Sequence, residues 1–206
     1  MKKKILFALL SLLVAASFES RAQHFTVSTN AVGYAWYGTL NAEMSVAVGR
    51  RYSIHVGGLY NNWALSSNDP AKMNFDKQRS LYAGLRFWPW YVYSGWWGQI
   101  KLRYAEYNFA NPLYSKKTDD GYTNEMGDRF GAGLSAGYTI MISPHFNLDF
   151  GVGFWAGMAK YSLYSFPKAY VTDDLGYCPT CGRPVSSGSK FFFLPNDITV
   201  SLVYVF

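Results

Sequence analysis

The sequence contains few charged residues and little cysteine, and each shortage excludes a class of protein. Charged residues make up only 16% of the chain, against 50% hydrophobic residues, so a largely disordered chain is excluded. Only two cysteines occur, which excludes a small domain held together by several disulfides. Beyond the first residues, no apolar run reaches the roughly 18 residues that indicate a transmembrane helix.

Aromatic residues, in contrast, are abundant. They make up 19% of the chain, with 17 Tyr, 15 Phe and 7 Trp. Such a content is more typical of broad β surfaces or of a membrane interface than of an ordinary soluble core. The 206 residues suffice for one domain with a sizeable core.

The N-terminus has the pattern of a secretory signal peptide. Lys2–Lys4 form a basic start, Ile5–Phe18 form a short apolar stretch, and small residues precede a cleavage after Ala22. We therefore expect a signal peptide over residues 1–22 and a mature chain over residues 23–206. Part of the formal charge of +6 belongs to this leader, and no basic stripe follows it, so we expect no nucleic-acid partner.

The rest of the chain alternates between apolar and polar residues with a period of two. Phe130–Ile142 and Phe146–Met158 carry unbroken apolar faces whose length suits a tilted crossing of a bilayer. Eight strands of this kind are predicted, at about 24–35, 39–48, 52–62, 80–90, 96–109, 130–142, 146–158 and 198–206. The fold class predicted is all-β, an eight-stranded antiparallel up-and-down transmembrane β-barrel.

The predicted connections alternate between short and long. Short turns at 49–51, 91–95 and 143–145 fall at one end of the barrel, and a hairpin is expected near Trp36. Long extracellular loops are predicted at about 63–79, 110–128 and 162–190. Tryptophans cluster near the strand ends, where we expect them to form the two interfacial girdles: Trp88, Trp90, Trp96 and Trp97 at one end, and Trp36 and Trp63 at the other.

The last strand carries a candidate assembly signal. Leu202, Tyr204 and Phe206 share its apolar face, and a terminal Phe two residues after an aromatic residue resembles the signal that barrel-assembly machinery recognises. The alternative is an amphipathic terminal strand in a soluble barrel. Together with the signal peptide, the pattern favours the outer membrane, with outer-membrane lipid and the assembly machinery as partners.

An eight-stranded barrel is just wide enough for side chains to fill it, so we expect a plug and not a pore. The inward polar positions are Asn30, Asn41, Glu43, His55, Arg86, Gln99, Lys101, Arg103 and Asp149. Because unpaired charge in a confined lumen is costly, we expect Glu43 and Asp149 to pair with some of Arg86, Lys101 and Arg103.

Enzymatic activity is not expected. His55 lies low on its strand, His24 lies at the N-terminus and His145 lies in a turn, so no Ser/His/acid set is predicted to converge at the outer rim. We therefore predict no catalytic residue, no metal site and no cofactor. A lipid-active outer-membrane enzyme is the less favoured alternative.

Both cysteines lie in the longest predicted loop, as Cys178 and Cys181 of a CxxC motif followed by Gly182. A structural zinc site needs four ligands, and a redox CxxC needs a thioredoxin-like context that is absent here. Three interpretations remain: a local disulfide, which the exported location favours, two free thiols, or a metal shared between molecules.

Spaced motifs along the whole mature chain carry a resemblance to a known family. They are Ser28–Asn30, Thr39–Glu43, Gly49–Ser53, Tyr60–Trp63, Leu85–Trp88, Gly98, Tyr107–Asn108, Gly131–Tyr161, the CxxC loop and Ser201–Tyr204. In these motifs the chain resembles a Bacteroidota family of small outer-membrane barrels that is described as a domain of unknown function. It departs from the family pattern at Leu194–Asn196, where a Gly-Pro-Thr-type turn is expected, which puts the corner before the last strand in question.

The resemblance identifies a fold more than an activity. Family members often lie among genes for surface fimbriae, which implies a surface or fimbrial protein partner. The favoured hypothesis is a non-catalytic outer-membrane barrel that stabilises the envelope or presents its loops to such a partner. The alternative is an accessory subunit of an outer-membrane assembly for fimbrial biogenesis, secretion or uptake.

Overall fold

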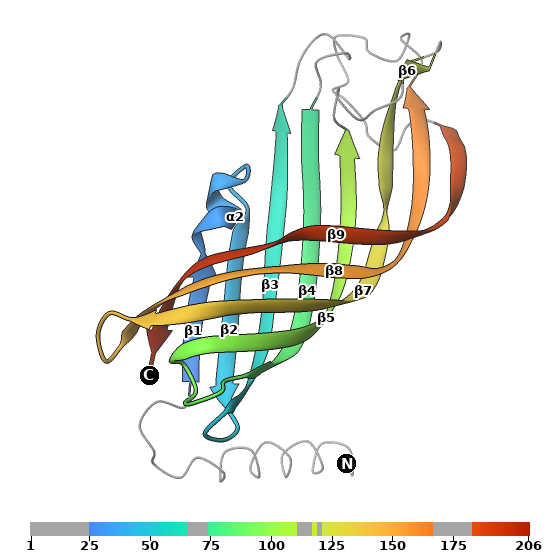
Figure 1. Ribbon diagram of the computed structural model, residues 1–206. Coiled ribbons are helices and arrows are strands. Elements are labelled where there is room, and N and C mark those ends of the chain that lie inside the picture. Colours follow the sequence, from blue (N-terminus) through green and yellow to red (C-terminus); the bar gives the residue numbers. More distant parts are fainter. Residues whose placement is uncertain (1–24, 66–73, 111–116, 119–120, 167–182) are drawn as a thin grey trace, which may run out of the picture.

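The computed structural model describes residues 25–65, 74–110, 117–118, 121–166 and 183–206 (Figure 1). The elements are β1 (Phe25–Asn30), α2 (Ala31–Ala35), β2 (Leu40–Ala47), β3 (Tyr52–Leu65), β4 (Asn74–Phe87), β5 (Gly95–Ala110), β6 (Lys117–Thr118), β7 (Gly121–Met141), β8 (Phe146–Phe166) and β9 (Arg183–Val205). The strands form one antiparallel sheet in the order β5-β4-β3-β2-β1-β9-β8-β7-β6, and β5 also pairs with β7. Eight strands therefore close into a ring, which confirms the predicted all-β architecture.

The ring is staggered, so a path along the strand pairing climbs as it goes round. A path that leaves β8 at Phe146 crosses Tyr204, Val27, Met44, Val56, Ala83, Leu102 and Ala132 and returns to β8 at Ala156. Such a stagger tilts the strands, which a closed sheet of this size requires. The short two-residue strand β6 lies outside this path, beside β7.

Side chains alternate between the two faces of the ring, as the period-two pattern predicts. Large apolar side chains on the outer face are exposed, and examples are Ile54, Leu85, Ile100, Leu134 and Val152. Polar and small side chains on the inner face are buried, and examples are Ser53, His55, Arg86 and Asp149. Over this part of the strands the outer face is therefore largely apolar, and the inner face carries many buried polar side chains.

The apolar outer face ends at a sharp boundary. Exposed Leu81, Tyr104, Phe130, Met158 and Phe191 lie in one row across β4, β5, β7, β8 and β9. Two residues further along each strand, on the same outer face and away from the start of β1 and the end of β9, the next row contains Arg79, Glu106, Asp128 and Lys160. We call this second row the charged collar.

The start of the chain differs from the prediction of a strand over residues 24–35. Only Phe25–Asn30 is a strand, and Ala31–Ala35 forms a short helix. The side chain of Asn30 caps this helix by accepting a hydrogen bond from the Val32 backbone N–H at 3.0 Å. Asn41 holds the same corner, because its Oδ1 accepts from the Asn30 N–H at 2.6 Å. These two amides satisfy the backbone where the ladder ends.

The predicted long loops are shorter than expected. Strands β3, β4, β7, β8 and β9 extend into the ranges 63–79, 110–128 and 162–190. These extensions lie beyond the charged collar, where both faces of the sheet carry polar residues, so the apolar alternation stops although the hydrogen-bond ladder continues. The signal peptide of residues 1–22 and the CxxC motif of Cys178 and Cys181 lie outside the described residues.

The departure from the family pattern at Leu194–Asn196 coincides with an irregularity in the sheet. The register between β8 and β9 shifts between the pairs Gly153↔Asp197 and Trp155↔Leu194. Such a β-bulge bends the strand and changes where the following side chains point. One consequence is that Asp197 lies inside the ring, as described below.

Two apolar clusters fill the interior. The lower cluster, next to the start of β1 and the end of β9, consists of Trp88, Tyr93, Trp97, Val203 and Val205. The upper cluster consists of Ala105, Trp155, Ala159 and Phe192. The prediction that Trp88 and Trp97 belong to an interfacial girdle is therefore wrong, whereas Trp90 and Trp96 are exposed. Trp97 points inward because Gly137 and Gly151 leave space for its ring, and a Cβ at Gly137 would lie 2.3 Å from Trp97 Cζ2.

No helix in the described part of the chain has both the length and the apolar character that crossing a membrane requires.

Candidate functional site

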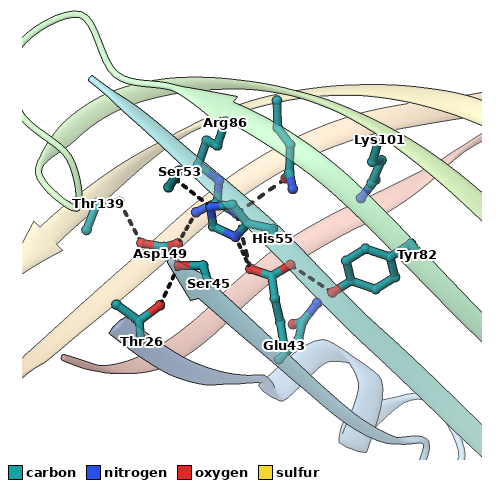
Figure 2. A network of polar contacts seen from close by, with 12 residues as sticks. Thr26, Glu43, Ser45, Ser53, His55, Tyr82, Arg86, Lys101, Thr139 and Asp149 are labelled. Atoms are coloured by element: carbon teal, nitrogen blue, oxygen red, sulfur yellow. Dashed lines mark hydrogen bonds and ion pairs between the residues drawn. The ribbon is translucent and has the colours of Figure 1, made fainter. Parts of the chain in front are cut away.

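A network of ionic and hydrogen-bonding side chains lies inside the ring, above the lower apolar cluster (Figure 2). Four strands contribute its main members: Glu43 from β2, His55 from β3, Arg86 from β4 and Asp149 from β8. Each points inward because it has the parity of the buried face of its strand. We call this group the lumen network.

Arg86 is the central cation of the lumen network. Its Nη1 lies 2.7 Å from Asp149 Oδ2, and its Nη2 lies 3.5 Å from Glu43 Oε1 and 3.3 Å from Gln99 Oε1. The guanidinium carbon also lies 4.0 Å from the ring centroid of Trp97. The arginine thus bridges the two predicted acids and stacks on the lower apolar cluster, which limits the cost of burying its charge.

Glu43 has two further partners. His55 Nδ1 lies 2.8 Å from Glu43 Oε1, and Tyr82 donates its hydroxyl to Glu43 Oε2 at 2.8 Å. Gly57 lies opposite Tyr82 in the sheet and makes this contact feasible, because a Cβ there would lie 2.4 Å from the tyrosine oxygen. Asp149 is satisfied in the same way, since Thr139 donates to its Oδ1 at 2.5 Å.

Ser53, His55 and Glu43 form a relay that the sequence analysis missed. Ser53 Oγ lies 2.8 Å from His55 Nε2, and His55 Nδ1 faces Glu43. An ionised Glu43 carboxylate can only accept, so His55 Nδ1 donates to it, and in a neutral imidazole Nε2 then accepts from the Ser53 hydroxyl, which itself accepts from Trp88 Nε1 at 3.0 Å. Two sequence signals could have revealed the set: the shared parity of Ser53 and His55, and the short turn that fixes their register against Glu43.

The relay has the Ser–His–acid hydrogen-bond sequence of a hydrolase triad, but its serine is not accessible to a substrate. Ser53 is 0% exposed, and His55 only 2%. The cavity that His55 lines with Glu43 measures about 10 Å³, which is too small for a substrate. In this arrangement the three side chains satisfy one another's hydrogen bonds inside the closed ring.

Lys101 and Arg103 do not contact Glu43 or Asp149. Lys101 forms an ion pair with Asp197, the acid that the β-bulge of β9 turns inward. Arg103 donates from Nε to Ser80 Oγ at 3.2 Å, and its guanidinium lies 4.7 Å from the ring centroid of Trp155. Asp197 was missed because it follows a proline-containing corner that shows no alternation.

A second ionic group, also missed, lies higher in the ring. Glu125 accepts from Lys190 Nζ at 2.7 Å and from the Tyr107 hydroxyl at 2.8 Å. Arg129 lies 4.0 Å from Glu125, and its guanidinium lies 3.8 Å from the ring centroid of Tyr107. Glu125 and Lys190 lie within the predicted loops 110–128 and 162–190, so they were not predicted to be lumen residues.

Little free volume remains within this part of the ring. A cavity of about 100 Å³ lies among Glu43, Arg86, Lys101, Arg103 and Asp197. It has room for a small group of water molecules. Glu43, Asp149, Asp197 and Glu125 each have a cationic partner, so the interior combines close packing with paired charge. Among the described residues, no group of three His, Cys, Asp or Glu side chains is placed to hold a metal.

The residues of the candidate assembly signal lie apart from the network, on the outer face. Leu202 and Tyr204 are exposed there, and Phe206 follows the last strand. The Tyr204 ring contacts Phe146 at 5.1 Å and Phe206 at 4.8 Å between centroids. Phe206 also contacts Phe25, with 5.3 Å between the ring centroids, at the seam where the first and last strands meet.

Comparison with known proteins gives one family. The profile of the family described as “Protein of unknown function (DUF3575)” matches residues 8–206. No curated protein matches the chain, and no solved structure does. The resemblance to a family of unknown function is confirmed at this level.

Proposed function

The chain belongs to the DUF3575 family, and from this premise we propose that it is a non-catalytic outer-membrane β-barrel with a lumen filled by side chains. Its role in this proposal is to stabilise the cell envelope and to present its extracellular end to a surface partner. The Bacteroidota origin, the signal peptide of residues 1–22 and the fimbrial association belong to the same proposal.

The observation that carries the proposal is the apolar outer face. Exposed aliphatic and aromatic side chains cover it on strand after strand, with Ile100, Leu134 and Val152 near its centre. In water such a surface would promote aggregation, whereas in a bilayer its apolar side chains contact lipid chains with little cost in free energy. A closed ring also satisfies every backbone group between neighbouring strands, which is the condition for crossing a membrane with strands.

The charged collar also supports the proposal that the apolar outer face lies in a bilayer. Polar headgroups begin where the hydrocarbon ends, so a change from apolar to charged side chains along one row is expected at that level. Arg79 and Glu106 form an ion pair within the collar, on adjacent strands. Beyond the collar, the extensions of β3, β4, β5, β7, β8 and β9 are available to a partner outside the membrane.

The filled interior favours a structural role over transport or catalysis. Arg86 and its acids occupy the middle of the ring, and the two apolar clusters lie below and above them. Solutes therefore lack a continuous path, and Ser53 has no contact with solvent. A conserved reaction site needs both a reactive group and access to it.

Expression of the full chain in a Gram-negative host tests the proposal. We expect the protein in the outer-membrane fraction, with heat-modifiable migration on gels, because a closed barrel resists unfolding by detergent until it is heated. Recovery of the folded protein in the soluble periplasmic fraction, with no membrane association, would overturn the proposal.

A further inference from the structure

Two arginines at one end of the ring have no side-chain partner among the residues that the structure describes. Arg50 and Arg51 form the turn between β2 and β3, and both are exposed. Neither side chain has a hydrogen bond, ion pair or ring contact with any residue that the structure describes. The other arginines with described side chains all have partners: Arg79 has Glu106, Arg86 has Asp149, Arg103 has Ser80 and Arg129 has Glu125.

This end of the ring also lacks acidic side chains. Its described connections are residues 48–51, 88–94 and 142–145, and none of them contains Asp or Glu. His145 is engaged with the backbone, because its Nδ1 lies 3.0 Å from the Val205 carbonyl oxygen. These described connections therefore provide no carboxylate side chain for the two arginines.

Two exposed aromatic residues accompany the arginines. Trp90 and Tyr91 are 59% and 67% exposed, in the connection between β4 and β5. The backbone joins this connection to the arginine turn, since the Val92 N–H donates to the Arg50 carbonyl at 2.9 Å and the Trp88 N–H donates to the Arg51 carbonyl at 2.8 Å. We call the group of Arg50, Arg51, Trp90 and Tyr91 the arginine rim.

The connection beside the arginine turn is anchored in the interior of the ring. Trp88 and Tyr93 anchor the connection in the lower apolar cluster, with their ring centroids 5.9 Å apart. Tyr93 has a φ of 65°, a conformation that is uncommon for a residue of this size and that its buried packing maintains. The arginines and the exposed aromatic rings are therefore presented together by a fixed backbone, which lowers the entropy cost of binding.

The position of the arginine rim determines which membrane groups it can contact. The apolar outer face ends at this end of the ring with exposed Tyr52, Phe87 and Trp96. In the proposed membrane orientation, the rim lies at the headgroups of the leaflet that faces the periplasm. Guanidinium groups bind phosphate oxygens in pairs of hydrogen bonds, and Trp and Tyr prefer the headgroup level of a bilayer.

We propose that the arginine rim binds the headgroups of anionic phospholipids in this leaflet. The unpaired charges of Arg50 and Arg51 provide the affinity for the phosphodiester, and Trp90 and Tyr91 lie against the glycerol and upper acyl region. This inference rests on the proposed membrane barrel and adds a ligand class to it. Each basic residue near an anionic membrane surface contributes about fivefold in affinity.

Spin-labelled lipids test the inference in reconstituted vesicles of phosphatidylcholine. The wild-type protein should restrict labelled phosphatidylglycerol more than labelled phosphatidylcholine. In the double variant Arg50→Gln/Arg51→Gln, this preference should fall about fivefold or more. The matched control is Arg79→Gln, an arginine that is 71% exposed at the opposite edge of the apolar face but paired with Glu106, and it should leave the preference unchanged.

Additional measurements distinguish lipid phosphate from free phosphate. They also distinguish failure of this inference from failure of the proposed function. Inorganic phosphate should displace the labelled lipid no better than chloride at equal ionic strength, and selective displacement would assign the rim to free phosphate. Trp90→Ala should weaken the preference without removing it. Only heat-modifiable, inserted protein is measured, so equal binding of both lipids by that protein overturns this inference alone, whereas failure to insert overturns the proposed function.

Discussion

Glu43 connects three strands through one carboxylate, and this makes it the most sensitive acid of the lumen network. It contacts His55 on β3 and Tyr82 and Arg86 on β4. Replacing it with Ala leaves Arg86 with Asp149 as its only acidic partner in the described network. We expect the free energy of unfolding to fall by about 3–5 kcal/mol, the usual cost of breaking a buried ion pair.

Thermal or urea unfolding of the inserted protein measures this effect. Glu43→Gln should cost less than Glu43→Ala, because the amide keeps the size and an acceptor oxygen. The matched control is Glu106→Ala, which removes the exposed partner of Arg79 and should cost about 0–1 kcal/mol. Equal costs at the two positions would show that Glu43 has no buried charged partner.

Ser53 provides a test of the non-catalytic interpretation. Ser53→Ala removes the acceptor of the buried Trp88 N–H and the partner of His55, so we expect a loss of about 1–3 kcal/mol in stability. The wild-type protein should not react with a fluorophosphonate probe, because Ser53 is fully buried. Labelling of the wild type that disappears in Ser53→Ala would contradict a purely structural role for the relay.

At the residue scale, the sequence predicts well which side chains face inward. It predicts less well which of them form ion pairs or hydrogen bonds with one another. The parity of each strand places Glu43, Arg86 and Asp149 inside, and hydrogen-bond geometry then decides the pairs. Lys101 pairs with Asp197 only because a β-bulge alters the register of β9, and no alternation in the sequence signals such a bulge. Charge balance can be expected from sequence, but specific partners require the register.

At the scale of single strands, the outward-facing positions of β8, which contact lipid in the proposed barrel, carry a measurable prediction. Val152 is 68% exposed on the outer face, far from either end of its strand. Val152→Arg places a charge in the hydrocarbon and should cost about 2–4 kcal/mol. Ser187→Arg, on an exposed position of β9 beyond the charged collar, should cost about 0–1 kcal/mol. Urea titrations in phospholipid vesicles compare the two, and similar costs would mean that the outer face does not contact lipid.

The last strand, β9, carries a prediction about assembly. Tyr204 packs against Phe146 and Phe206 on the outer face. Tyr204→Asp and deletion of Phe206 should each abolish the heat-modifiable form in outer-membrane fractions, because both remove the aromatic pair at the C-terminus. Quantitative immunoblots of membrane fractions measure this, and normal levels of folded protein in both variants would exclude an assembly role for these residues.

The elements themselves follow the sequence wherever one face is apolar and the other is polar. β7 and β8 meet this condition over their central residues. The predicted range 146–158 lies inside β8, and the predicted range 130–142 passes the end of β7 by one residue. The pattern fails beyond the charged collar, where both faces are polar, and at α2, whose five residues are too few for a helical period to be distinguished from an alternating one. The helix depends instead on the side chains of Asn30 and Asn41.

For the whole molecule, the filled interior predicts that the barrel conducts no ions across a membrane. The lumen network and the two apolar clusters occupy the middle of the ring, and the cavity between them measures about 100 Å³. The wild-type protein should therefore give no steady conductance in planar bilayers. Glu43→Ala should give brief openings at most, since it loosens the packing around Arg86. A large and stable wild-type conductance would falsify the filled interior.

The seam between β1 and β9 has a consequence for how the chain reaches its final state. These strands are the first and last of the ring, and they pair only from Thr26 to Asn30 with Ser201 to Val205. The joints among the other strands can form without β9, whereas this joint and the joint between β8 and β9 both need it. Closure is therefore the last and most non-local event, with the slow kinetics that such contacts impose. A chain that lacks β9 would leave two edges unpaired at once, one on β1 and one on β8.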